Sequence, residues 1–231
     1  MIEIEGLGKV FGNRWVLRGL NLRVERGEFL TVLGPNGSGK TTLLKVLATL
    51  LRPSQGSMRI GGRDMKDGAE VRRLLGFVGH ESLLYEDLTS LENLQFYARM
   101  YDVPGAEARI KALAEEMDLA PFLGEKVRIL SHGMKKRLSI ARALLHNPPV
   151  VLLDEPETGL DQKATAILFE TLERFVGQRT AVMTTHNLER GLKMADRVII
   201  LSQGKITYQG SKPFDCATFP ETYFRCTATQ P

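Results

Sequence analysis

Apolar and polar residues alternate through residues 1–10 and again through residues 16–28. A period of two is typical of strands that bury one face, so the pattern predicts two half-buried antiparallel strands. Residues 27–34 form a nearly continuous apolar run that enters a glycine-rich turn, which predicts a buried strand. Residues 56–64 add a short strand between glycines.

Helical periodicity begins at residues 41–51 and stops before Pro53. Further along, Thr89 and Glu92 have the spacing of a capping box, which predicts that a helix opens at residues 90–101. These patterns place a helical region in the middle of the chain.

The second half continues with a helix over 106–118 and another that follows Ser131 and ends at Asn147, before two prolines. Strands and helices then alternate: strands at 150–155, 180–186 and 197–206, helices near 162–176 and 187–195. Apolar strands alternating with helices predict a parallel sheet covered on both faces.

The start of the helix after Ser131 is unusual. Ser131 is the expected N-cap, but Met134 at the third helical position cannot complete a capping box. Lys135, Lys136 and Arg137 add positive charge at the end where the helix dipole is already positive. An anion bound at this helix start would reconcile the pattern, and solvated side chains are the alternative.

Composition changes this picture little. The 231 residues are 43% hydrophobic and 25% charged, with a net charge of +4, which does not by itself call for a nucleic-acid partner. The chain lacks a signal-peptide pattern and an apolar run of about 20 residues. We therefore expect a cytoplasmic protein. Cys216 and Cys226 lie in a tail without periodicity, and we expect two unrelated thiols there rather than a terminal disulfide.

The turn after the strand at 27–34 matches G-x-x-x-x-G-K-[ST] and opens a helix. Glycines let the loop direct successive N–H groups at phosphate oxygens, Lys40 reaches the β- and γ-phosphates, and the Thr41 hydroxyl takes a Mg²⁺ position. The candidate nucleotide-binding residues are Gly34, Pro35, Asn36, Gly37, Ser38, Gly39, Lys40, Thr41 and Thr42.

Two carboxylates follow the apolar strand at 150–155, at the end where α/β sheets bind ligands. Asp154 suits a contact to Mg²⁺ or its water. Glu155 is the candidate general base for the attacking water, the alternative being a solvated loop carboxylate.

At this point the sequence resembles the nucleotide-binding subunit of ATP-binding cassette (ABC) transporters, over about residues 1–210. "KVFGN" places Phe11 where the family stacks an aromatic on adenine, and a core aromatic is the alternative. "TTHNLE" places His186 at the switch histidine, which the resemblance implies contacts the γ-phosphate. "LLDEPETGLD" ends at Asp161 in the D-loop, where an N-cap is the other reading.

Two motifs depart from the family. "LSHGM" stands where the signature L-S-G-G-Q belongs, so its trans residues are Ser131, His132, Gly133 and Met134, and the final glutamine is lost. The Q-loop glutamine in "GFVGHE" is replaced by His80, whose neutral nitrogen can serve a metal or water. The Gly-His pair resembles the Ccm-type haem exporters of cytochrome c biogenesis. The sequence therefore resembles this group most, and haem export is the expected function. "LSHGMKKRLSIARAL" also resembles ATPases of drug, lipid or polysaccharide exporters, which are the alternative.

The resemblance implies a P-loop NTPase fold of α/β class, an ABC ATPase core with an antiparallel β subdomain and an inserted helical subdomain at about 84–147. A single domain would cover 1–210, followed by a short tail at 211–231. We expect MgATP hydrolysis by a head-to-tail homodimer that drives an integral membrane permease from the inner face of the membrane. Leu83, Leu84 and Tyr85 are candidate permease contacts, and the alternative is that they pack inside the helical subdomain. The alternatives are a soluble ABC-type ATPase without a transport role and a nucleotide-gated binding module, which the Asp154-Glu155 pair disfavours.

Overall fold

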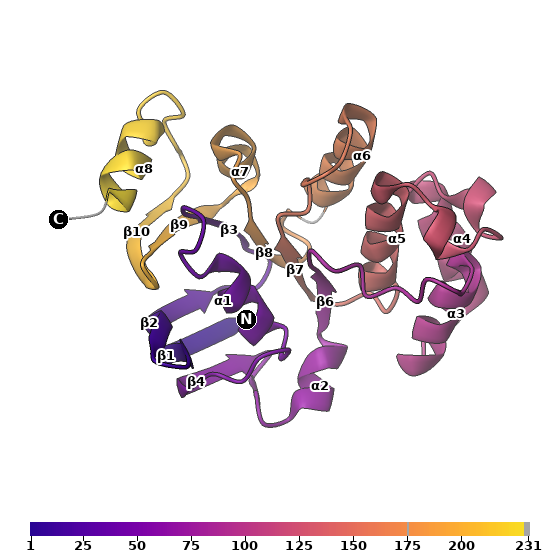
Figure 1. Ribbon diagram of the computed structural model, residues 1–231, viewed down its shortest axis with the longest axis horizontal. Coiled ribbons are helices and arrows are strands. Elements are labelled where there is room, and N and C mark those ends of the chain that lie inside the picture. The colour runs from indigo at the N-terminus through magenta and orange to yellow at the C-terminus, as the bar shows by residue number, and fades with distance from the viewer. Residues whose placement is uncertain (175, 229–231) are drawn as a thin grey trace.

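The computed structural model describes residues 1–174 and 176–228 (Figure 1). An antiparallel sheet in the order β2-β1-β4-β5 is built from β1 (Ile2–Phe11), β2 (Arg14–Val24), β4 (Gln55–Ile60) and β5 (Arg63–Asp64). Ile2 pairs with Val24 and Ile4 with Leu22, so the apolar alternation of both strands falls on one buried face. The antiparallel strands predicted from this alternation are confirmed.

The second sheet has the order β10-β9-β3-β8-β7-β6. Its strands are β3 (Phe29–Leu33), β6 (Leu75–Val78), β7 (Val150–Asp154), β8 (Thr180–Thr184), β9 (Arg197–Ser202) and β10 (Lys205–Ser211). The strands from β9 to β6 are parallel, as predicted, whereas β10 runs antiparallel to β9. Reading 197–206 as one strand was wrong, because Gln203 and Gly204 take positive φ values of 48° and 77° and turn the chain back.

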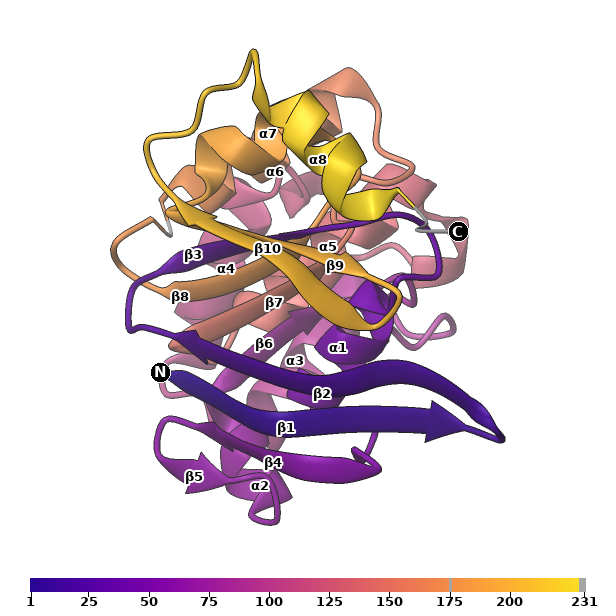
Figure 2. The ribbon, with the colours of Figure 1, turned by 90° about the vertical axis from the view of Figure 1, so that its left-hand side faces the viewer.

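This sheet is covered on both faces, and the two faces take alternate residues of its strands. Leu30 and Val32 pack with α1 (Lys40–Leu47) and the antiparallel sheet. Leu33 packs instead toward α7 (Leu188–Met194). Figure 2 shows α6 (Gln162–Glu173), α7 and α8 above the sheet, with the antiparallel sheet below it. The sheet therefore lies in the centre of the molecule, and its strand ends carry the site.

A group of helices lies beside the edge strand β6 (Figure 1). It consists of α3 (Ser90–Met100), α4 (Ala106–Glu116), α5 (His132–Leu144) and the 3-10 helices Ala120–Phe122 and Val127–Ile129. The capping box is confirmed: Thr89 accepts from the Glu92 N–H, and the Glu92 carboxylate accepts from the Thr89 N–H. The helix α2 (Gly68–Arg73) and the strand β6 were not predicted. The helix has six residues and the strand four, so neither is long enough to show a clear hydrophobic period.

The C-terminal tail was expected to lack periodicity, and this was wrong up to residue 228. Helix α8 (Phe219–Thr227) packs Phe219, Tyr223 and Cys226 against β9 and β10. The i, i+4, i+7 spacing of these three residues is the signal that was overlooked. Cys216 and Cys226 are free thiols, as expected. Residue 175 of the predicted helix 162–176 and residues 229–231 lie outside the described part of the chain.

Within the described residues, we find no helix whose length and apolarity would let it cross a membrane.

Candidate functional site

The glycine-rich loop joins β3 to α1, and the structure explains two of its glycines. Gly34 has φ 152°, and a Cβ there would lie 2.1 Å from the carbonyl oxygen of Leu201. Gly39 has φ 109°, and its Cβ would approach the carbonyl oxygen of Val16 to 2.9 Å. Neither position accepts a side chain, and glycine at both allows the loop to curl at the N-terminus of α1. The helix dipole at this end favours a bound phosphate.

Lys40 lies at the floor of this loop with 5% of its surface exposed. Its Nζ donates to the carbonyl oxygens of Gly34 at 2.8 Å and Pro35 at 3.2 Å. Burial lowers the pKa of Lys40, while the negative charges of Glu155 and Asp154 act in the opposite direction. The loop carbonyls therefore hold the ammonium group next to the carboxylates, where it can meet phosphate oxygens.

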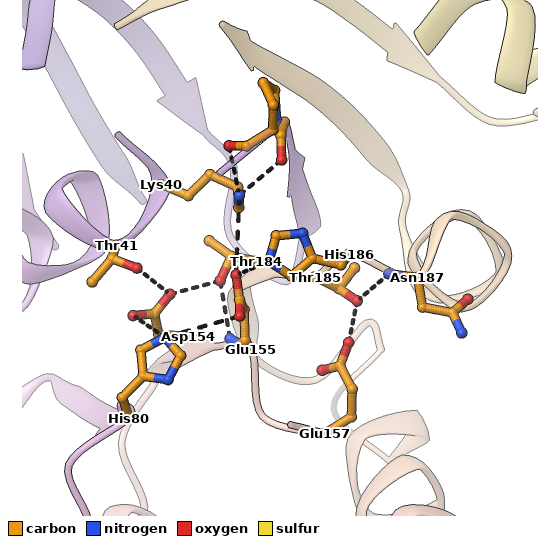
Figure 3. A network of polar contacts seen from close by, with 12 residues as sticks. Lys40, Thr41, His80, Asp154, Glu155, Glu157, Thr184, Thr185, His186 and Asn187 are labelled. Carbon is orange, nitrogen blue, oxygen red and sulfur yellow. Dashed lines mark hydrogen bonds and ion pairs between the residues drawn. The ribbon is translucent and has the colours of Figure 1, made fainter. Parts of the chain in front are cut away.

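Asp154, at the end of β7, is fully buried. Its Oδ1 accepts hydrogen bonds from Thr41 Oγ1 at 3.2 Å and Thr184 Oγ1 at 2.8 Å (Figure 3). Its Oδ2 has no hydrogen-bond partner, and His80 Nε2 lies 3.8 Å from it. A buried carboxylate oxygen without a donor, beside a threonine hydroxyl, fits Mg²⁺ or one of its waters.

The described residues hold no cluster of three or more His, Cys, Asp or Glu side chains suited to a metal. Asp154 and Thr41 are donors of the kind that Mg²⁺ uses, since it usually binds through one or two carboxylates, several waters and the phosphates of a substrate.

Glu155 follows Asp154 with φ 47°, a left-handed conformation that is unusual for a residue other than glycine. Its N–H is held by Thr184, through the backbone oxygen at 3.2 Å and the hydroxyl at 3.0 Å. Its carboxylate contacts His186 Nε2 and lies 4.0 Å from Lys40 Nζ and 3.9 Å from His80 Nε2. The predicted base is therefore surrounded by the predicted phosphate-binding groups (Figure 3).

These side chains border an open cleft of about 670 Å³. Phe11 is 47% exposed and lies on the cleft wall, which excludes the core-aromatic alternative. The cleft is lined by Phe11, Arg14, Val16, Asn36, Gly37, Gly39, Lys40, Thr41, Thr42, His80 and Glu155. Arg14 and Val16, on the strand after Phe11, were missed because nothing in their local sequence sets them apart.

The residues at the start of α5 do not belong to the described lining of this cleft. Ser131 caps α5 by accepting from the Met134 N–H at 3.2 Å, as predicted, and Ser131 and His132 are exposed. A Cβ on Gly133 would meet only Ala164 and Leu160, each at 3.8 Å. The fold of this chain thus leaves ordinary room for a side chain at 133, and a glycine there leaves space for a molecule approaching from outside.

Two further predicted residues have contacts within the chain. The His132 ring packs on Gly159. A Cβ added to Gly159 would lie only 2.5 Å from His132 Nε2. Asp161 caps α6 by accepting from the Ala164 N–H at 2.8 Å. The N-cap interpretation of Asp161 is confirmed, and a second role across an interface stays a prediction.

The three cations at the start of α5 are neither simply solvated nor without partners. Lys135 Nζ lies 3.0 Å from Glu86 Oε1, and Lys136 Nζ donates to the Gly79 carbonyl oxygen at 3.1 Å. Arg137 donates to the carbonyl oxygen of Met117 at 2.6 Å. Tertiary contacts that no local pattern reveals therefore account for this charge.

The most important residue that sequence reasoning missed is Thr184, which links Asp154 to the backbone of Glu155. The neighbouring Thr185 hydroxyl contacts the Glu157 carboxylate and accepts from the Asn187 N–H at 3.0 Å. Both threonines precede His186, so their position at the end of β8 was the available signal.

The protein-family model described as ABC transporter matches residues 17–158, which contain both the phosphate loop and the Asp154-Glu155 pair. The chain belongs to the ABC transporter family. Among relatives of this ABC protein, the daunorubicin resistance ATP-binding protein DrrA3 of Streptomyces coeruleorubidus is 39% identical over 91% of the chain and 68% of its own length. The Nod factor export ATP-binding protein I of Ralstonia nicotianae is 35% identical, covering 94% and 69%.

Solved structures agree with the fold of this ABC protein. A post-hydrolysis dimer of the ATP-binding cassette MJ0796 bound to ADP and Pi matches with a TM-score of 0.86 at 27% identity, over 93% of this chain and 100% of that one. The P-loop fold with an antiparallel β part and a helical part, and the assignment as an ATP-hydrolysing ABC ATPase, are confirmed. The names of these relatives give no support to the haem-exporter assignment.

Proposed function

We propose that this ABC ATPase works as a head-to-tail dimer that hydrolyses MgATP and drives a separate integral membrane permease in export. One observation carries the proposal. Phe11, the phosphate loop, His80 and Glu155 all line one cleft. The exposed N-cap Ser131 lies outside this cleft, and it is followed by Gly133, where the fold of this chain would leave room for a side chain. A second subunit would bring its own Ser131-Gly133 helix start to the phosphates.

The catalytic groups divide the work as follows. The loop N–H groups and Lys40 hold the phosphates, and Phe11 stacks on the base. Asp154, Thr41 and, through a water, His80 would hold Mg²⁺, which neutralises phosphate charge when bound. Glu155 orients the water and takes its proton as the new P–O bond forms and the bond to the ADP oxygen breaks. Thr184 fixes the direction of that carboxylate through the backbone.

The Glu155 carboxylate lies 4.0 Å from Lys40 Nζ and in direct contact with His186 Nε2. A γ-phosphate bound next to Glu155 would also contact the Lys40 ammonium group and the His186 imidazole. These two side chains could then bind the substrate and stabilise the charge of the phosphoryl group during its transfer. His186 is the predicted γ-phosphate contact in this arrangement.

The permease contact is proposed on the surface beside the His80 segment. Leu83 is 37% exposed and Tyr85 49%, and the Tyr85 ring lies 5.0 Å from that of Phe96, itself 41% exposed. Leu84, the third residue expected there, instead packs against the core. The proposed contact is therefore Leu83, Tyr85 and Phe96, and it would place the chain on the inner face of a membrane.

Export is favoured by the names of relatives that serve daunorubicin resistance, linearmycin resistance and Nod factor export. A spermidine/putrescine import protein of Bacillus thuringiensis is also 35% identical, so identity alone does not fix direction. Haem export is the second candidate, and it rests on the Gly79-His80 pair in place of the Q-loop glutamine. We place haem export behind export of a drug, lipid or polysaccharide.

The dimer is tested with Glu155→Gln, which should trap ATP without turnover. Light scattering should report an ATP-dependent dimer for Glu155→Gln, and only monomer when Ser131→Arg is added. Fluorescence titration should find ATP binding to that double variant still intact, since its phosphate loop is unchanged. A double variant that still dimerises with ATP would refute the trans site.

The transport role is tested separately by purification from detergent-solubilised membranes. Recovery of an integral membrane protein with the wild type, reduced by Tyr85→Ser, supports the proposed surface. Recovery of nucleic acid or a soluble scaffold instead would favour the ATPase without a transport role.

A further inference from the structure

Three polar side chains on one face of α5 are buried although they lie outside the cleft. Lys136, Ser139 and Arg142 are 7%, 0% and 6% exposed. Their spacing of three residues places them along one side of the helix. Lysine and arginine are rarely buried without partners, so their partners are informative.

Each of the three donates to a backbone carbonyl oxygen of the segment 77–82, which leads out of β6. Lys136 Nζ reaches Gly79 at 3.1 Å and Ser139 Oγ reaches Ser82 at 2.9 Å. Arg142 Nη2 reaches Phe77 at 2.6 Å. Residues 79–82 have left the sheet, so their carbonyls lack strand partners, and α5 supplies donors in place of the ladder. Figure 1 shows α5 alongside β6.

The held segment contains His80. The imidazole Nε2 of His80 lies 3.8 Å from Asp154 Oδ2, at the end of β7, and 3.9 Å from Oε2 of the next residue, Glu155. The backbone of His80 is thus fixed from the helix side, by Lys136 on the preceding carbonyl, while its ring faces the site.

The N-cap of the same helix is Ser131, only five residues before Lys136. At 1.5 Å per residue, this separation is about 7–8 Å along the helix axis. Burial lowers the pKa of Lys136, and the charges of Asp154, Glu157 and Glu155 oppose that effect. The ammonium group therefore lies within the field of the catalytic carboxylates as well as against Gly79.

We propose that Lys136, Ser139 and Arg142 are positioning residues that clamp the segment 77–82 to α5, so that the place of His80 relative to Asp154 and Glu155 follows the helix start at Ser131. This proposal extends the proposed function, and it rests on that function only for the role of His80 at the ATP site. A second subunit's triphosphate bound at Ser131-Gly133 would then be sensed at this subunit's own cleft through a rigid helix and three hydrogen bonds.

The clamp is tested first in the free protein by hydrogen exchange. Lys136→Met keeps much of the side-chain volume and removes the donor. We expect the amides of 79–83 to exchange about tenfold faster, with those of β7 and α5 unchanged. Lys135→Met is the matched control, because it removes the same charge one residue away, where the ammonium pairs with Glu86 on the surface.

Kinetics then separates positioning from folding. Lys136→Met should lower kcat for ATP about tenfold with KM within twofold, and Lys136→Arg should restore most of it by keeping a donor. A folded Lys136→Met with wild-type exchange at 79–83 and wild-type kcat would overturn the proposal. If Lys136→Met does not fold, Ser139→Ala is measured in the same way, and unchanged exchange there overturns it equally.

The coupling has its own readout in Glu155→Gln. ATP should slow exchange at 79–83 in that variant, and the slowing should disappear when Lys136→Met is added, while ATP binding persists. Equal slowing in both would overturn the coupling. The hydrogen-exchange measurement on the free protein needs no ATP. It therefore tests the clamp even if the proposed dimerisation or hydrolysis is not observed.

Discussion

The hydroxyl of Thr184 donates a 2.8 Å hydrogen bond to Oδ1 of Asp154, across the neighbouring strands β8 and β7. The Thr184 hydroxyl oxygen also accepts a hydrogen bond from the N–H of Glu155 at 3.0 Å. One side chain therefore orients the proposed metal carboxylate and fixes the left-handed backbone of the proposed base.

This relationship predicts that Thr184→Val lowers kcat roughly tenfold, because a misplaced base loses much of its effect while the valine preserves shape. Each lost hydrogen bond should also reduce the free energy of unfolding by about 1 kcal/mol. Thr184→Ser, which keeps the hydroxyl, is the control for phosphate-release and denaturation measurements. Unchanged kcat in Thr184→Val would show that Thr184 has no positioning role.

Glu155→Gln is predicted to lower kcat by about 10²–10⁴, the usual contribution of a positioned general base, with ATP binding retained. Glu157→Gln is the matched control, because Glu157 lies two residues on and contacts Thr185 rather than the cleft. Steady-state phosphate release and a binding titration give the two quantities. Hydrolysis by Glu155→Gln at the parent rate would remove Glu155 from the base role.

Phe11→Ala should weaken ATP binding by about 1–3 kcal/mol, the usual range for stacking of a base on an aromatic ring. The expected signature is a KM raised at least fivefold with kcat little changed, because the base is remote from the reacting phosphate. Phe11→Tyr should behave as the wild type. A kcat defect without a KM change would instead indicate that Phe11 supports the loop.

Met134 stands where the resemblance implies a glutamine that contacts the ribose across the dimer, and it packs partly against the core. Met134→Gln would restore one neutral hydrogen bond, worth about 1 kcal/mol, at each of the two sites of the dimer. We therefore expect it to tighten the ATP-dependent dimer about 30-fold in the Glu155→Gln background. Light scattering across a protein dilution series measures this. Unchanged or weaker association would mean that position 134 makes no such contact.

His146 links pH to stability. Burial lowers the pKa of His146 to about 4. Nε2 pairs with the Leu75 carbonyl oxygen at 3.0 Å, while the buried Nδ1 has no partner. The folded protein keeps this ring neutral, whereas the unfolded chain takes up a proton below about pH 6.5. The contribution of His146 to stability is therefore present above pH 6.5 and is lost as pH falls toward 4, by at most about 3 kcal/mol.

The variant His146→Phe isolates the contribution of the histidine proton to stability. The Tyr101 ring stacks on His146 with 4.0 Å between centroids, and phenylalanine keeps a ring in this place. Urea unfolding between pH 4.5 and 7 should show a shallower pH dependence for the variant, since the carboxylates titrate alike in both proteins. Parallel curves for the two proteins would contradict the assignment.

Local chain properties decided what the sequence could predict. A phosphate loop, a buried strand that ends in Asp154-Glu155, and a capping box at Thr89 each consist of neighbouring residues whose backbone geometry and chemistry are set within a few positions. Period-two alternation likewise fixed the antiparallel strands, because a one-residue slip would bury the polar face. The order of these motifs also identified the family.

Only the tertiary structure decided which distant groups meet. It brought His80 from the end of β6, and Thr184 and His186 from the end of β8, to Asp154 and Glu155. It also gave Lys136 a carbonyl partner 57 positions earlier in the chain. It also turned β10 back on β9 and packed α8 on that pair. Such contacts depend on how separate elements pack. The three helix-start charges, an anomaly in the sequence, become explicable only once Glu86, Gly79 and Met117 are in place as their partners.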